Sequence, residues 1–144
     1  MRWKLSCTVL RGLDGSNPVQ LLDKREGAGK QPFFFSLRDG RPFGFAGLWD
    51  RWKGQDEKFI ESCTILTTEA NEVLRPVHDR TPVILHPETY DLWLERDVRA
   101  VASLKELLGP YPASEMTAYP VSAQVNSPRN QGEDLVARMA INSA

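Results

Sequence analysis

The chain has 144 residues, of which 41% are hydrophobic and 26% charged, and its net charge is -1. This length suits one domain with its own core, and the composition excludes disordered, collagen-like and membrane-spanning classes of protein. A balance of 18 basic against 19 acidic residues does not by itself predict a nucleic-acid partner.

The first residues carry two positive charges, and no apolar segment follows them, so we expect no secretory signal. A cytoplasmic protein is therefore predicted, in which Cys7 and Cys63 remain thiols. The two cysteines and two histidines lack the spacing of metal ligands, and no phosphate-binding glycine motif is present. We accordingly predict neither a metal nor a cofactor.

Turn-forming residues dominate residues 12–30, which predicts a loop with one short strand at residues 19–22. The aromatic residues at 32–37 and 42–49 predict two strands. The Asp-Gly pair between them predicts that these strands form a hairpin. Gly44 and Gly47 within the second strand predict a bulge or a close approach of another backbone.

The middle of the chain predicts a strand over residues 62–68 and then the start of a helix capped by Thr68. A short buried strand is predicted at residues 83–85. Pro87 then opens a helix that continues to residue 94. Tyr90, Trp93 and Leu94 share one face of this helix, which we expect to face the core.

A second helix is predicted over residues 103–108, ending at Gly109 and Pro110. Residues 116–125 predict a last strand, which Pro120 interrupts and thereby places at a sheet edge. Strands and helices mix without alternating regularly, which predicts the α+β class.

His78 is the strongest candidate for acid–base chemistry, because an imidazole can both donate and accept a proton near neutral pH. Arg80 follows two residues later, and in an extended segment both side chains lie on one face. A base beside a phosphate-binding cation would form a working pair. The alternative is that His78 is a structural residue in the connection from helix to strand.

Thr67 and Thr68 end a predicted strand just before a predicted helix, where hydroxyls and backbone amides can bind an anion. Simple capping of the helix by Thr68 is the competing interpretation. Among the tryptophans, Trp49 lies in an apolar run typical of a core. Trp52 lies between Arg51 and Lys53, where stacking on a base is possible.

Three blocks together resemble the SRAP family, the SOS-response-associated peptidase or abasic-site processing proteins. They read Phe-Gly-Phe-Ala-Gly-Leu-Trp-Asp-Arg-Trp at residues 43–52, Glu-Ser-Cys-Thr-Ile-Leu-Thr-Thr-Glu-Ala-Asn at 61–71 and His-Asp-Arg-Thr-Pro-Val-Ile-Leu at 78–85. The resemblance runs from about residue 31 to residue 142. It implies an antiparallel, barrel-like sheet with peripheral helices, incomplete at its N-terminus. Residues 1–30 are then a divergent segment, and residues 31–144 are the SRAP-like domain.

The resemblance also implies a function in the DNA-damage (SOS) response. SRAP proteins bind single-stranded DNA and capture abasic sites covalently through a cysteine that follows the initiator methionine. It implies that His78 is catalytic and that Arg80, with Thr67 or Thr68, contacts the DNA. Here Arg2 stands where the family has that cysteine, and the family's Asn-Ala-Arg-x-Glu and Gly-Phe-Tyr-Glu-Trp blocks are not recognisable. Thr81 also replaces the methionine usual in the family.

Whether the chain is an enzyme is therefore left open. The leading hypothesis is a truncated or divergent abasic-site processing domain that binds damaged single-stranded DNA. The alternative is a non-catalytic interaction module or pseudogene-like fragment, whose exposed sheet edges predict poor solubility or oligomerisation. A third hypothesis, that the chain is a protease, follows from the family name alone.

Overall fold

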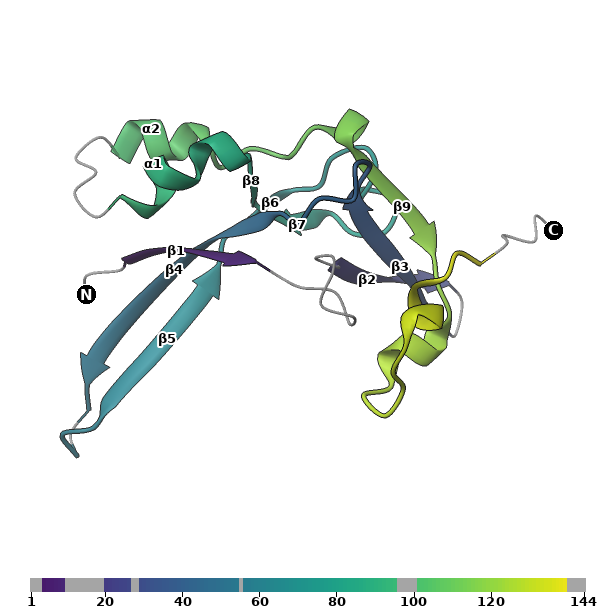
Figure 1. Ribbon diagram of the computed structural model, residues 1–144, viewed down its shortest axis with the longest axis horizontal. Helices are drawn as coiled ribbons and strands as arrows, with labels where there is room; N and C mark the ends of the chain where they lie inside the picture. The colour runs from purple at the N-terminus through teal and green to yellow at the C-terminus, as the bar shows by residue number, and fades with distance from the viewer. Residues whose placement is uncertain (1–3, 10–19, 27–28, 55, 96–100, 140–144) are drawn as a thin grey trace.

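The computed structural model describes residues 4–9, 20–26, 29–54, 56–95 and 101–139 (Figure 1). Within these ranges the strands form antiparallel sheets, and the helices are few and short. The predicted α+β class with antiparallel sheets is confirmed. The sheets formed by the described strands are open and do not close into a barrel.

Three sheets are present in the described part of the chain. The first has the order β1-β4-β5, with β8 also paired to β4, and is built from β1 (Lys4–Val9), β4 (Gly44–Lys53), β5 (Phe59–Ile65) and β8 (Ile84–Leu85). The second has the order β2-β3-β9 and is built from β2 (Gln20–Glu26), β3 (Gly29–Leu37) and β9 (Met116–Pro120). The third pairs β6 (Thr67–Glu69) with β7 (Arg80–Pro82).

The N-terminal third contains more strand than predicted. The interpretation of residues 12–30 as mainly loop is wrong for β2, which pairs with β3 from Gln20 opposite Phe35 to Glu26 opposite Gly29. The three consecutive phenylalanines in the second half of β3 supply an apolar surface on which a neighbouring strand can pack, even where the sequence of that neighbour predicts a loop. Part of the expected strand at residues 19–22 lies outside the described residues.

The Asp-Gly turn forms, but the hairpin predicted from it is wrong. Gly40 has φ 70°, and its N–H donates to the carbonyl of Leu37 at 3.1 Å. Asp39 accepts from the N–H of Arg41 at 2.9 Å and from its Nε at 2.6 Å. The two strands then diverge into different sheets, because β3 pairs with β2 and β9 whereas β4 pairs with β1, β5 and β8. A bulge at Gly44 or Gly47 is also not found, since the register of β4 with β1 is continuous.

The strand predicted at residues 62–68 is divided at Leu66 between β5 and β6. Three buried or half-buried residues meet at this point in a closed set of hydrogen bonds. The N–H of Leu66 donates to the carbonyl of Ala46, that of Val83 to Leu66, and that of Ala46 to Val83, each at 2.9 Å. This junction joins the β6–β7 pair to the centre of the first sheet.

The helix predicted to follow Thr68 is absent, and Thr68 is not a cap: it lies within β6, opposite Thr81. The chain instead turns over residues 72–77. Asn71 is the residue that caps these turns, since its Oδ1 accepts from the N–H groups of Val73 and Leu74 at 3.1 Å each. The side-chain amide offers the backbone a local alternative to helix, as asparagine commonly does.

The helix predicted over residues 87–94 is confirmed as a 3-10 turn, η1 (Pro87–Thr89), followed by α1 (Tyr90–Leu94). Trp93 is buried, and the Tyr90 hydroxyl accepts from the N–H of Gly44 at 2.9 Å, which is a close backbone approach of the kind that glycine permits. Leu94 was expected in the core and is 47% exposed. Because α1 is only five residues long, it turns just one narrow face to the sheet.

The remaining elements complete the second sheet and its cover. The second predicted helix is α2 (Val101–Glu106), which begins and ends slightly earlier than predicted. The predicted edge position of β9 is confirmed, but the strand ends at Pro120. One 3-10 turn, η2 (Ala113–Glu115), comes before β9. Two more follow it, η3 (Ala123–Asn126) and η4 (Glu133–Val136).

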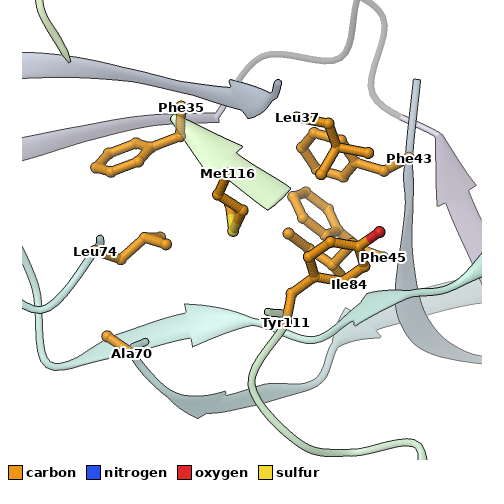
Figure 2. Packing of buried hydrophobic residues seen from close by; sticks show 9 residues of the cluster. All are labelled: Phe35, Leu37, Phe43, Phe45, Ala70, Leu74, Ile84, Tyr111 and Met116. Carbon is orange, nitrogen blue, oxygen red and sulfur yellow. The ribbon is translucent and has the colours of Figure 1, made fainter. Parts of the chain in front are cut away.

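Two hydrophobic clusters lie on opposite faces of β4, as alternation along a strand requires. Phe45 belongs to the cluster between the two larger sheets, where Met116 lies among aromatic and aliphatic side chains (Figure 2). Ala46 belongs to the other cluster, in which Trp93 and the leucines of the α2 region cover the first sheet. Burying one large side chain contributes roughly 1.5 to 3 kcal/mol. Packing on both faces therefore fixes β4 in the middle of the domain.

Candidate nucleic-acid interface

The β6–β7 pair positions three of the predicted site residues. Its register places Thr67 opposite Pro82, Thr68 opposite Thr81, and Glu69 opposite Arg80. Thr81 is 3% exposed, and since side chains alternate across a strand, Thr68 shares its inward face. Thr67 and Arg80 then lie on the outer face, where both are exposed. Of the two candidate threonines, Thr67 is the one on the surface.

The guanidinium of Arg80 binds both oxygens of Thr67. Nε and Nη2 donate to the Thr67 hydroxyl at 3.1 and 2.8 Å, and Nη2 also donates to the Thr67 carbonyl at 2.9 Å. Nη1 makes no hydrogen bond with the described residues, so its two N–H groups remain for a ligand. Thr67 thus holds the arginine side chain in position and leaves Nη1 outside these contacts.

His78 precedes β7 and lies next to Arg80. Its side chain is 51% exposed, its Nδ1 accepts from the N–H of Arg80 at 3.1 Å, and the Asp79 Oδ1 lies 2.9 Å from the same nitrogen. A neutral Nδ1 can accept from the amide, whereas a protonated Nδ1 donates to the carboxylate. The two contacts require different positions of the ring proton, and neither of them uses Nε2. Asp79 was not predicted as a site residue. The only signal for it in the sequence is its position next to His78.

The loop that carries His78 is anchored from inside by Asn71. This side chain is 9% exposed; its Nδ2 donates to the carbonyl of Tyr111 at 2.7 Å and lies 3.2 Å from the sulfur of Met116. The N–H of Ala70 donates to the carbonyl of Asp79 at 2.9 Å and closes the loop. The exposed residues near His78 therefore stand on a buried, hydrogen-bonded base.

The model of the family described as SOS response associated peptidase (SRAP) matches residues 23–128. This range covers most of the chain and contains the whole β6–β7 pair. The chain belongs to the SRAP family.

Two similar proteins support the assignment. Abasic site processing protein YoqW of Bacillus subtilis is 40% identical over 107 residues, which are 74% of this chain and 48% of that protein. Abasic site processing protein YedK of Escherichia coli is 35% identical over 115 residues, which are 78% of this chain and 51% of that protein. The chain spans about half the length of each of these relatives.

A crystal structure of a protein from Bacteroides thetaiotaomicron has the same fold. It matches with a TM-score of 0.78 and 25% identity, over 95% of this chain and 57% of that one. This SRAP chain thus matches a little more than half of that solved structure.

Trp52 is not part of the cluster around Arg80. It is 48% exposed and pairs across the β4–β5 ribbon with Ile60, seven residues before Thr67. At about 3.3 Å per residue, that separation is roughly 20 Å along the chain. Figure 1 shows this end of the ribbon pointing away from β6 and β7. The SRAP site residues predicted from sequence therefore separate into a cluster of three on the surface, an inward Thr68 and a remote Trp52.

The described residues of this SRAP domain contain no group of three or more His, Cys, Asp or Glu side chains arranged to hold a metal ion. Cys63 is a free, exposed thiol in β5. No helix in the described ranges is long and apolar enough to cross a membrane.

A second polar region surrounds Tyr111, on the far side of the Asn71 anchor. Burial, and next the nearby Glu115 carboxylate, raise the pKa of Tyr111 to about 12. Its hydroxyl donates to Glu115 Oε2 at 3.2 Å, and its ring stacks on His86 with centroids 4.4 Å apart. His86 directly precedes η1.

Proposed function

We propose that this chain binds single-stranded DNA at or beside abasic sites, in the cytoplasm and in the response to DNA damage. Arg80 and Thr67 would hold the DNA backbone, and His78 would transfer protons at the damaged sugar. The proposal draws its substrate from relatives that are named abasic site processing proteins. Because the chain spans about half of those proteins, their activity is proposed for it and not transferred as a fact.

The Arg80–Thr67 contact is the observation that carries the proposal. An arginine held by two oxygens loses little further side-chain entropy when it binds an anion. Its free Nη1 donors suit a phosphate oxygen, and charge-assisted bonds of this kind are roughly twice as strong as neutral ones. The neighbouring imidazole of His78 is exposed enough to reach a bound sugar, as a general acid or base must.

Covalent capture is not proposed for Cys63. Capture of the ring-opened sugar as a thiazolidine requires an amine and a thiol on the same residue, and the nitrogen of Cys63 is a peptide amide within β5. We propose a lyase-type role instead: a primary amine of the chain condenses with the aldehyde, and His78 assists removal of the proton that leads to strand scission.

The test is the affinity for an abasic single-stranded oligonucleotide, measured by fluorescence anisotropy over a range of salt concentrations. Arg80→Ala should weaken binding to all sequences alike and lower the slope of log affinity against log salt by about one unit. Arg129→Ala, which removes another exposed arginine between η3 and η4, is the matched control and should leave both quantities unchanged. Equal effects of the two substitutions, or salt-independent binding, would contradict the proposal.

A non-catalytic interaction module is the second candidate, and one observation favours it. All seven residues of β5 are exposed in this structure. If the Arg80→Ala variant and the unchanged chain have the same affinity for DNA, the interaction module is the better explanation of the structure.

A further inference from the structure

The β4–β5 ribbon leaves one long strand edge uncovered. Figure 1 shows the ribbon extending from the body of the domain, and among the described strands β5 pairs with β4 alone. Every residue of β5 is exposed, including Phe59 at 59% and Ile60 at 42%. Trp52 lies opposite Ile60 and is exposed to a similar extent. Apolar side chains and a free edge therefore coincide on one element.

The direction of the backbone groups in β5 follows from two hydrogen bonds at its ends. The N–H of Gly54 donates to the carbonyl of Lys58 at 2.8 Å, and the N–H of Leu66 donates to the carbonyl of Ala46 at 2.9 Å. Even-numbered residues of the strand thus turn their backbone groups toward β4. Because the direction alternates in an antiparallel ladder, the odd-numbered residues turn theirs outward. These outward residues are Phe59, Glu61, Cys63 and Ile65.

Several of the devices that protect an edge strand are absent from β5, although it carries one charged residue, Glu61. Its sequence contains neither proline nor lysine, and its register with β4 runs without a bulge from Phe59 to Ile65. A long, regular and apolar edge of this kind is a template for pairing with another strand.

The charges of the ribbon indicate what kind of partner fits. Three ion pairs neutralise it internally: Lys53 with Glu57 at 2.9 Å, Lys58 with Asp56 at 3.3 Å, and Arg51 with Glu61 at 3.5 Å. The Arg51 guanidinium also lies 3.9 Å from the ring centre of Phe59. A surface whose cations are all paired has little attraction for a polyanion, whereas a neutral and apolar strand meets no repulsion there.

We propose that β5 pairs with β5 of a second copy of this chain, antiparallel and centred on Ser62. This register uses all seven residues, and its hydrogen-bonded pairs are formed by the outward residues alone. Phe59 then lies opposite Ile65 of the second copy, and Glu61 lies opposite Cys63 of the second copy. The two Glu61 carboxylates therefore do not face each other, which removes the like-charge contact that would oppose pairing.

Disulfide trapping tests the register. Ser62 would face itself across a non-hydrogen-bonded pair, where Cα atoms are about 4.5 Å apart, a distance within the range that disulfides span. In a background with Cys7→Ala and Cys63→Ser, Ser62→Cys should give a covalent dimer under mild oxidation. Thr64→Cys, on the same face of the same strand, is the control: its thiols would be roughly 13 Å apart and should not crosslink.

Sedimentation of the unchanged chain tests the assembly itself and should show a species of twice the 16.3 kDa of one chain as concentration rises. Cys63→Pro removes an outward N–H and no bond to β4. It should therefore weaken dimerisation at least tenfold while keeping the far-ultraviolet circular dichroism spectrum of the monomer. A monomer at all concentrations, or equal crosslinking of the two cysteine variants, overturns the proposal. The proposal is also overturned if the chain stays monomeric and the backbone amides of the ribbon become protected from hydrogen exchange only when abasic single-stranded DNA is added. That outcome would show that the ribbon binds nucleic acid.

Discussion

Arg80 reaches across the face of β6 to Thr67 and occupies both oxygen atoms of that residue with one guanidinium. The two residues are diagonal neighbours on the outer face of the hairpin, since Arg80 pairs with Glu69 in the ladder. The position of the cation is thus fixed by a neutral partner, and its charge stays uncompensated by that contact.

Thr67→Val removes the hydroxyl and keeps the β-branched shape suited to a strand. A lost hydrogen bond of this kind is worth about 0.5 to 1.5 kcal/mol, so affinity for abasic single-stranded DNA should fall roughly two- to tenfold. Anisotropy titrations measure it, and Thr67→Ser, which keeps the hydroxyl, should restore the binding. Unchanged affinity in Thr67→Val would show that Arg80 does not need this partner.

His78→Ala separates a chemical role from a structural one. An exposed residue usually contributes within about 0.5 kcal/mol to stability, so the melting temperature should change little. Strand scission of an abasic oligonucleotide should slow, because the imidazole no longer assists proton removal. A large loss of stability together with unchanged scission would assign His78 to structure, through its contact with the Arg80 amide.

Asn71→Ala should be more harmful than any change at the exposed site residues. It leaves the N–H of Val73 and the carbonyl of Tyr111 without their side-chain partner, whereas the N–H of Leu74 keeps the backbone carbonyl of residue 71 at 3.2 Å. Unsatisfied buried groups cost about 1 to 3 kcal/mol each, and urea denaturation should show a loss of at least that size. Ser122→Ala removes an exposed cap of η3 and is the control, with an expected loss of about 1 kcal/mol or less.

Asn71 also shows what the sequence could and could not predict. The strands at residues 32–37 and 84–85 and the turn at Gly40 are local features, and local pattern predicted them. The partner of β3 was mispredicted because strand pairing is decided by contacts between distant segments, such as Phe34 with Tyr119. The cap after β6 was assigned to Thr68 instead of Asn71, because only the buried contact with Tyr111 distinguishes between two plausible capping residues.

For the candidate site, the sequence brought His78 and Arg80 together through their spacing, and the structure places them in contact through a backbone amide. The contact between Arg80 and Thr67 depends on the register of a hairpin whose loop spans residues 70–79, which a linear pattern does not specify. Trp52 was chosen for its basic neighbours, but those neighbours bind acids of the same ribbon. Their ion pairs are visible only in three dimensions.

Tyr111 predicts a loss of stability at alkaline pH. Its pKa is about 12 in the folded chain, against about 10 in an unfolded one, so the unfolded chain releases the phenolic proton first. The stabilisation is present below pH 10 and is lost as pH rises toward 12. Tyr111→Phe should flatten this decline in urea melts at several pH values. An equal decline in both proteins would show that Tyr111 does not cause it.

No heat-stable crosslink should form between the 144-residue chain and an abasic oligonucleotide, because Cys7 and Cys63 carry peptide nitrogens and cannot close a thiazolidine ring. Denaturing gels decide the matter. A shifted band that survives heating and disappears in Cys7→Ala or Cys63→Ala would refute the argument. A band that is lost on heating when no borohydride has been added would indicate only a reversible imine.

The closed set of hydrogen bonds among Ala46, Leu66 and Val83 separates two parts of the chain mechanically. On one side of it, β6 and β7 are tied to β4 at a point that cannot shift without breaking buried backbone bonds. On the other side, the ribbon runs out to the turn near Gly54 and Lys58. Residues can be added or removed in pairs at that outer turn, lengthening or shortening the ribbon, without moving Thr67 or Arg80. A change in the length of the β4–β5 ribbon would therefore leave the Arg80 cation in its place.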